Sequence, residues 1–173
     1  APPALTDHKI GSHAKISSVR FLVTDGTHLY VAANNAVKKV DLVAKTLSTV
    51  SGHSVFGGHV DANGGNARHG NIWGLERVTG GIYSIDRGSH VIRFTDNLGN
   101  TRTIAGDPMV AGYVEATNPG DVARFNGMTG LCSIGNSLYV VDNDNVRVRR
   151  LDVGDINNPV TNPATVFIAG SSS

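Results

Sequence analysis

The chain has 173 residues, of which 40% are hydrophobic and 17% charged, a balance that supports a folded core and excludes a disordered chain. Its net charge of +1 and its dispersed Lys and Arg residues do not match the basic patches of nucleic-acid-binding proteins. No apolar run reaches about 18 residues, so no transmembrane helix is expected. The 21 glycines favour many short strands and tight turns, and therefore an all-β fold.

Three segments of the chain resemble one another and define a repeat. Their sequences are HLYVAANNAVKKVD from His28, GIYSIDRGSHVIRFTD from Gly81 and SLYVVDNDNVRVRRLD from Ser137. The tyrosines that mark one column of this repeat are Tyr30, Tyr83 and Tyr139. The copies follow one another at a nearly constant interval, from Leu29 to Ile82 and from Ile82 to Leu138. Blade-sized repeats, roughly 40 to 50 residues long, are typical of β-propellers.

Each repeat predicts four strands in the same order. The first strand carries the leucines of a second column, which are Leu22, Leu75 and Leu131. The second strand carries the tyrosine, and the third follows a short turn. The fourth strand carries Val50, Ile104 or Ile168 and ends on a glycine, which is Gly52, Gly106 or Gly170. The predicted blades span about residues 15–52, 68–106 and 124–170.

Several pieces of this pattern occur together: a glycine-rich loop, Ala-Arg-Phe, a Gly-Leu strand, Leu-Tyr-Val-Val-Asp, an Asn turn, Val-Arg-Arg-Leu and a closing Ile-Ala-Gly. In combination they resemble the NHL repeat, most strongly from Ile104 to Gly170. In the first repeat Ala33 stands where the NHL pattern has Asp. The resemblance implies an all-β propeller segment of three four-stranded blades. NHL propellers include protein-binding, RNA-binding and a few lyase domains, so the resemblance does not select one function.

Three blades do not close a ring, because propellers typically have 4 to 8 blades. An open segment exposes the apolar faces of its end blades. We expect one of two completions: a second copy, which gives a homodimer and a six-bladed ring, or the remaining blades of a longer parent propeller. Residues 1–15 and Ser171–Ser173 read as the two halves of one inter-blade loop. The start Ala1-Pro2-Pro3 lacks Met and favours an extracellular or cell-surface location.

The loops at one end of the blades are the expected ligand face for a protein, peptide or glycan, because concave sites use a few convergent polar groups. The candidate ligand-binding residues are Asp86, Arg87, His90, Asp142, Asn143, Asp144, Asn145, Arg68 and Arg124. A structural interpretation competes with this one. The interval from Arg68 to Asp86 equals that from Arg124 to Asp142, as bracing ion pairs would require, and Lys15 with Ala33, at the same interval, lacks the pair.

Cofactors are not expected, although calcium and zinc each have a candidate set of residues. The Asp142–Asn145 turn suggests calcium, but an EF-hand loop needs Gly and Glu where Arg147 and Val153 stand. The histidines that suggest zinc are His53, His59, His69 and His90, and they show no metal-ligand spacing. A metal-dependent lyase or hydrolase using Asp86, His90 and Asp142 stays the enzymatic alternative, and a scaffold role in a larger surface protein is the third.

Three further predictions concern strand residues. Cys132, within GLCSI, is expected to be an inert core thiol. Trp73 and Phe125 each open a first strand and are expected to pack between blades. The basic residues of the third strands are expected to form a solvated positive stripe: Lys39, Arg93 and Arg150, with Lys38, Arg147 and Arg149 beside them.

Overall fold

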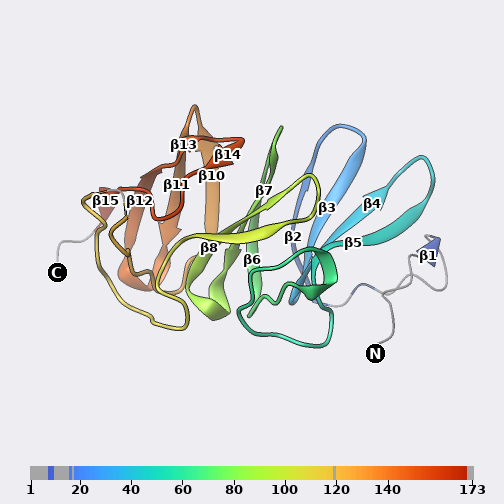
Figure 1. Ribbon diagram of the computed structural model, residues 1–173, viewed down its shortest axis with the longest axis horizontal. Coiled ribbons are helices and arrows are strands. Elements are labelled where there is room, and N and C mark those ends of the chain that lie inside the picture. Colours follow the sequence, from blue (N-terminus) through green and yellow to red (C-terminus); the bar gives the residue numbers. More distant parts are fainter. Residues whose placement is uncertain (1–7, 10–15, 17, 119, 171–173) are drawn as a thin grey trace.

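The computed structural model describes residues 8–9, 16, 18–118 and 120–170. This part of the chain is all-β and forms four antiparallel sheets, of which the three larger ones stand side by side as blades (Figure 1). Within these residues, no helix has the length and apolar character needed to cross a membrane. The predicted fold class, a segment of β-propeller blades, agrees with this architecture.

Blade 1 contains β2 (Val19–Thr24), β3 (His28–Ala33), β4 (Ala36–Asp41) and β5 (Thr46–Gly52). A short strand that the repeat did not predict, β1 (His8–Lys9), pairs with β5 at the outer edge. Blade 2 contains β6 (Ile72–Val78), β7 (Gly81–Asp86), β8 (Val91–Asp96) and β9 (Thr101–Ala105), which pair in chain order.

Blade 3 contains β10 (Gly130–Ile134), β11 (Ser137–Asp142), β12 (Arg147–Asp152) and β15 (Thr165–Gly170). A second unpredicted feature, the hairpin of β13 (Gly154–Asp155) and β14 (Asn158–Pro159), lies between β12 and β15. The 3-10 turns are η1 (Gly64–Asn66), η2 (Arg87–Ser89) and η3 (Asn143–Asn145). The turns η2 and η3 join the second and third strands of their blades.

The first strands of the three blades lie next to one another, with β6 between β2 and β10. This arrangement is expected of a propeller, in which the first strand of every blade faces the central axis. We call the face of a blade toward the preceding blade its front and the face toward the following blade its back. The back of blade 1 packs on the front of blade 2, and the back of blade 2 packs on the front of blade 3.

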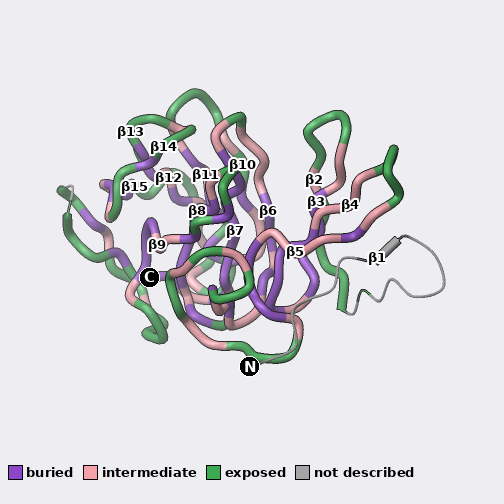
Figure 2. The backbone as a smooth tube through the Cα atoms, turned by 45° about the vertical axis from the view of Figure 1, so that its right-hand side comes forward, coloured by how far each residue is buried: buried purple, intermediate pink, exposed green. Residues whose placement is uncertain are grey.

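These two interfaces form the hydrophobic core. The first contains Tyr30, Ala32 and Val37 of blade 1 with Ile72, Leu75 and Ile82 of blade 2. The second is larger and includes Tyr83, Ile85, Ile92, Phe94 and Ile104 of blade 2 with Phe125, Met128, Leu131, Leu138 and Val140 of blade 3 or the loop before it. Blade 2 is therefore covered on both faces, and every residue of β7 is buried (Figure 2).

Each end blade has a neighbouring blade on one face only, and this corrects one prediction. Cys132, expected in a core, is exposed, because it lies on the back of blade 3, which no other blade among the described residues covers. The leucine column shows the same end effect: Leu75 and Leu131 are 0% and 9% exposed, whereas Leu22 is 57% exposed. Phe125 packs between blades as predicted, but it lies in the loop before β10 and does not open that strand. Trp73 of β6 packs partly against the same core.

Candidate functional site

The long loops 53–71 and 106–129 lie at the same end of the blades as the turns η2 and η3 (Figure 1). We call this end the loop end. The structure gathers the predicted site residues at this loop end. Several of them, however, are occupied in holding the loops to the strands.

Asp86 is fully buried at the end of β7 and accepts hydrogen bonds from backbone amides. The donors are the amides of Gly70 at 2.9 Å, Asn71 at 3.1 Å and Ser89 at 3.2 Å. Its Oδ2 lies 3.6 Å from Nη1 of Arg93. These contacts fasten the end of one long loop and the turn η2 to a single carboxylate, and they leave it little capacity for a ligand.

Arg93 of β8 is also fully buried and clamps the loop 53–71. Its Nη1 donates to the carbonyl oxygen of Arg68, and its Nη2 donates to the carbonyl of Val60 at 2.6 Å and to Oδ1 of Asp61 at 2.7 Å. Burial alone would raise the pKa of Asp61, but hydrogen bonds from Thr103 and the charge of Arg93 hold that pKa below its usual range. The guanidinium therefore meets a charged carboxylate.

Blade 3 repeats this clamp with Arg149 of β12. Its guanidinium donates to the carbonyl of Val114 at 2.6 Å, to Oε2 of Glu115 at 2.9 Å and to Oδ2 of Asp142 at 3.2 Å. The pKa of Glu115, which burial would raise, is lowered by the hydroxyl of Thr165 and by Arg149. Two blades thus use one buried arginine each to hold a loop that arrives from the preceding blade.

The predicted Arg68–Asp86 and Arg124–Asp142 ion pairs are wrong. Arg68 donates to the backbone carbonyls of Gly65 and Ala67, and Arg124 pairs with Asp107 at 2.9 Å. The carboxylates meet third-strand arginines instead, although the carbonyl of Arg124 does accept from Arg149 at 2.5 Å. The regular spacing therefore reflects a shared backbone position and not a shared side-chain contact.

The predicted solvated stripe is wrong for Arg93 and Arg149, which are 0% exposed. Strand register pairs Tyr30 with Lys39, Tyr83 with Phe94 and Tyr139 with Arg150. The buried column is therefore Lys38, Arg93 and Arg149. The column expected from sequence is displaced by one residue in blade 1, where the turn between β3 and β4 is shorter than η2, and by one residue in blade 3. Blade 1 has Lys38 in place of arginine and Ala33 in place of aspartate, so both members of the clamp change together.

The histidines proposed for zinc are held separately. His69 is buried, and burial followed by the charge of Arg93 lowers its pKa well below the usual value. Its Nδ1 accepts from Arg93 at 3.2 Å, so the neutral ring donates from Nε2 to Oγ of Ser51 at 2.9 Å. His53 binds local amides, and His59 contacts Thr103. Within the described residues, no three His, Cys, Asp or Glu side chains are grouped to hold a metal ion.

The remaining predicted residues lie on or beside η2 and η3. Asn145 donates to Gly112 and to Asp142, so it supports the loop. Asn143 donates to Asp144, whose side chain is 42% exposed. The Nδ1 atom of His90 is buried without a hydrogen-bond partner. Of the whole set, Arg87 is the residue with a guanidinium directed to an aromatic ring near the axis.

That ring is Trp73 of β6, and a second guanidinium shares it. The guanidinium carbon of Arg87 lies 4.3 Å from the centroid of the Trp73 ring, and that of Arg20 lies 4.5 Å away. Arg20 and Trp73 occupy matching positions on adjacent first strands. At both positions the pairing with the second strand shifts register, so both residues are bulged. β-Bulges redirect side chains and are frequent beside binding sites.

We call Arg20, Trp73 and Arg87 the axial cluster. Within the described part of the chain, Arg20 forms no hydrogen bond or ion pair. Arg87 has one ion pair, 3.6 Å to Asp144 of blade 3. Sequence reasoning missed Arg20 and assigned Trp73 to packing alone. The available signal was their common position in successive repeats, because Arg20 precedes Leu22 as Trp73 precedes Leu75.

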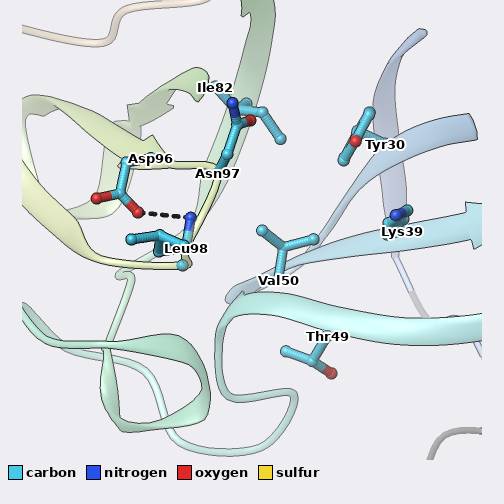
Figure 3. A pocket seen from close by; sticks show the side chains of 9 residues that line it. Tyr30, Lys39, Thr49, Val50, Ile82, Asp96, Asn97 and Leu98 are labelled. Atoms are coloured by element: carbon cyan, nitrogen blue, oxygen red, sulfur yellow. Dashed lines mark hydrogen bonds between the residues drawn. The ribbon is translucent and has the colours of Figure 1, made fainter. Parts of the chain in front are cut away.

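A separate pocket lies between blades 1 and 2 (Figure 3). It has a volume of about 240 Å³, and its lining includes Tyr30, Lys39 and Asp96. The Asp96 carboxylate accepts from the amide of Leu98 at 2.9 Å, and the Tyr30 hydroxyl donates to Asp25. The pocket contains none of the predicted site residues, and its polar groups are largely occupied by turn contacts.

Comparison with solved structures places this fold among known proteins. An auxiliary nutrient binding protein from Bacteroides ovatus ATCC 8483 has a TM-score of 0.64 and 27% sequence identity over 80% of the chain. The chain is similar to such nutrient-binding proteins. A second one, from Bacteroides thetaiotaomicron VPI-5482, has a TM-score of 0.62 and 24% identity over 76% of the chain.

The chain spans only about a third of these solved structures, 38% of the first and 36% of the second. A putative phosphatase from B. thetaiotaomicron shares the fold at 20% identity, with a TM-score of 0.58, over 77% of the chain and 33% of its own length. No protein-family model and no curated protein matches the chain. The NHL family therefore remains a resemblance.

Proposed function

We propose that the chain is a binding module whose axial cluster holds an anionic group of a protein, peptide or glycan partner at the loop end. The observation that carries this proposal is the pair of guanidinium groups over one indole ring at 4.3 Å and 4.5 Å. Neither guanidinium is clamped by the short hydrogen bonds that occupy Arg93 and Arg149.

The chemistry of the cluster favours an anion. A guanidinium presents its N–H donors in a planar fork that matches a carboxylate, sulfate or phosphate. Stacking on an aromatic ring uses the face of the guanidinium and leaves the N–H edge available. Because Trp73 holds both arginines in place, less side-chain freedom is lost when a ligand binds. Asp144 beside Arg87 is the group that an anion would have to displace.

The named neighbours support a binding role in general. The B. ovatus protein, at 27% identity, is an auxiliary nutrient binding protein, but the chain spans 38% of its length. We therefore carry over binding and not a particular nutrient. An extracellular or cell-surface location stays a prediction.

The test uses Trp73, the single tryptophan of the chain, as a local reporter. We would titrate the protein with trigalacturonic acid, a sulfated disaccharide, a short polyglutamate peptide and inorganic phosphate, and read tryptophan emission. We expect at least one anionic ligand to change the emission and neutral maltotriose to leave it unchanged. Arg20→Ala and Arg87→Ala should each weaken that binding about tenfold or more, which corresponds to about 1.4 kcal/mol.

The matched control is Arg102→Ala. Arg102 of β9 also lies over an aromatic ring, 5.8 Å from the centroid of Phe94, but its partner Asn158 belongs to the β14 hairpin. Affinity should survive this change. The proposal is wrong if maltotriose binds as tightly as the anions, if no anion alters the emission, or if the control weakens binding as much as Arg20→Ala.

A further inference from the structure

The back of blade 3 exposes apolar residues at positions where blades 1 and 2 bury theirs. Along the second strand, Ala32 of blade 1 and Ile85 of blade 2 are both 0% exposed, whereas Val141, their equivalent in blade 3, is 41% exposed. Along the fourth strand, Ile104 is fully buried and Ile168 is 45% exposed. The face that blades 1 and 2 use to receive the next blade is therefore uncovered in blade 3.

The interface between blades 2 and 3 shows how such a face is filled. A Cβ atom added to Gly74 would lie 3.0 Å from Cδ2 of Leu131 and 3.0 Å from Cδ1 of Ile85. Leu131 of blade 3 thus sits directly over the glycine of blade 2, beside an aliphatic side chain of the next strand. The glycine creates the recess, and the leucine of the following blade occupies it.

Blade 3 repeats this recess without an occupant among the described residues. Gly130 and Val141 are the equivalents of Gly74 and Ile85, one repeat further along the chain. A Cβ at Gly130 would have one neighbour within 4 Å, Cγ2 of Val141 at 3.7 Å. The apolar groove there has a volume of about 290 Å³, and Gly130, Leu131, Cys132 and Val141 contribute to its lining.

The matching leucine is on the opposite end of the same chain. Leu22 of β2 is the equivalent of Leu75 and Leu131, and it is 57% exposed. On the same strand Val19 is 53% exposed, whereas Val31 and Ala33, which pair with Leu22 and Val19, are 6% and 4% exposed. One chain therefore presents both halves of a blade-to-blade interface, a leucine on the front of blade 1 and a glycine recess on the back of blade 3.

We propose that a second copy of this chain docks its blade 1 on blade 3, with its Leu22 in the recess over Gly130. A two-fold axis makes the contact twice and gives a ring of six blades, within the 4 to 8 that propellers use. This inference does not depend on the proposed ligand site.

The first experiment measures the mass of the assembly in solution by light scattering. We expect twice the chain mass of 18.1 kDa. Leu22→Asp and Gly130→Leu, which alter the leucine and the recess at opposite ends, should each give a monomer. The matched control is Val55→Asp in the loop between blades 1 and 2, away from the proposed contact, where the valine is 74% exposed. This control should stay dimeric, and circular dichroism should show that every variant is folded.

The second experiment fixes the register of the contact. In the interface between blades 2 and 3, the amide of Ser133 donates to Oε1 of Glu76 at 2.9 Å. The equivalent positions across the proposed contact are Cys132 of one copy and Thr24 of the other. Because Cys132 is the single cysteine, Thr24→Cys should give a covalent dimer with a short bis-maleimide. Two controls should give far less covalent dimer. One combines Thr24→Cys with Cys132→Ser and so lacks the second thiol, and the other places the new cysteine at Thr27, in the neighbouring turn.

Dimer mass lost in both interface variants, together with the Thr24→Cys cross-link, would support the six-bladed ring. A stable monomer of the wild type would overturn it and point to other blades as the natural cover. The proposal would also be wrong if Leu22→Asp stays dimeric, or if the Thr24→Cys variant is dimeric but does not cross-link. In either case the two copies would meet through another surface.

Discussion

At the scale of residues, the loop end depends on two buried guanidinium groups. Arg93 and Arg149 each contact backbone carbonyls, a loop carboxylate and the aspartate that ends the second strand. A buried charge is tolerated when such a set of partners satisfies it, but removing one member leaves the others uncompensated. These residues therefore support the position of the loops and not the contact with a ligand.

Adjacent arginines of β12 offer a direct test of this view. Arg149→Met should lower the free energy of unfolding by about 3 kcal/mol or more, because Asp142 stays buried without its partner. Arg150→Met removes a surface pair with Asp152 and should cost less than about 1 kcal/mol. Urea unfolding measures both values. Equal losses of unfolding free energy in the two variants would show that the buried contacts of Arg149 stabilise the protein no more than a surface ion pair does.

At the scale of elements, each blade closes on a glycine whose conformation the fold requires. Gly52, Gly106 and Gly170 have φ values of 91°, 109° and 134°, in the region that favours glycine. Each also touches backbone at the start of its blade's third strand, so that at Gly106 a Cβ would lie 2.5 Å from the carbonyl oxygen of His90. The fourth strand can lie this close because the residue has no side chain.

Gly106→Ala should consequently destabilise the protein more than alanine at another glycine with positive φ. Gly120 has φ 97° and no atom within 4 Å of an added Cβ, so Gly120→Ala carries the backbone strain without the clash. We expect the strain to cost about 1 to 2 kcal/mol in either variant, with the contact to His90 adding further loss in Gly106→Ala. Thermal unfolding compares the two. If their midpoints fall equally, the close backbone approach is not important for stability.

At the scale of the whole molecule, the blades differ in how they are covered. Blade 2 has neighbours on both faces, whereas blades 1 and 3 each have one neighbour in the single chain. Stability in repeat architectures is close to a sum of nearest-neighbour terms, so end units open more readily than central ones. The single chain should therefore lose its end blades before its middle blade.

Hydrogen exchange of the Leu22→Asp variant tests this gradient. Amides of β7, where every residue is buried, should exchange about tenfold or more slowly than those of β11, whose burial is incomplete. Mass spectrometry of peptides from the two strands gives both rates. Indistinguishable rates would mean that all three blades open in one cooperative step.

The repeat determined much of this protein from sequence alone. Tyrosine, leucine and glycine recur at fixed places because every blade packs in the same way on its neighbour, so strand number, strand order and fold class follow from the pattern. The loop-end location of the candidate residues follows from the same topology. Arg87 could be named on this basis because it lies on a turn between the second and third strands.

The partners of those residues were decided only by the tertiary structure. Arg93 reaches Val60 and Asp61 in a loop distant along the chain, a contact that the repeat pattern does not encode. Arg20 meets Trp73 because bulges on two adjacent strands turn both side chains to one place. Exposure of Leu22 and Cys132 likewise depends on which blade has a neighbour. Local patterns fix the shape of a blade, whereas burial and pairing depend on what lies against it.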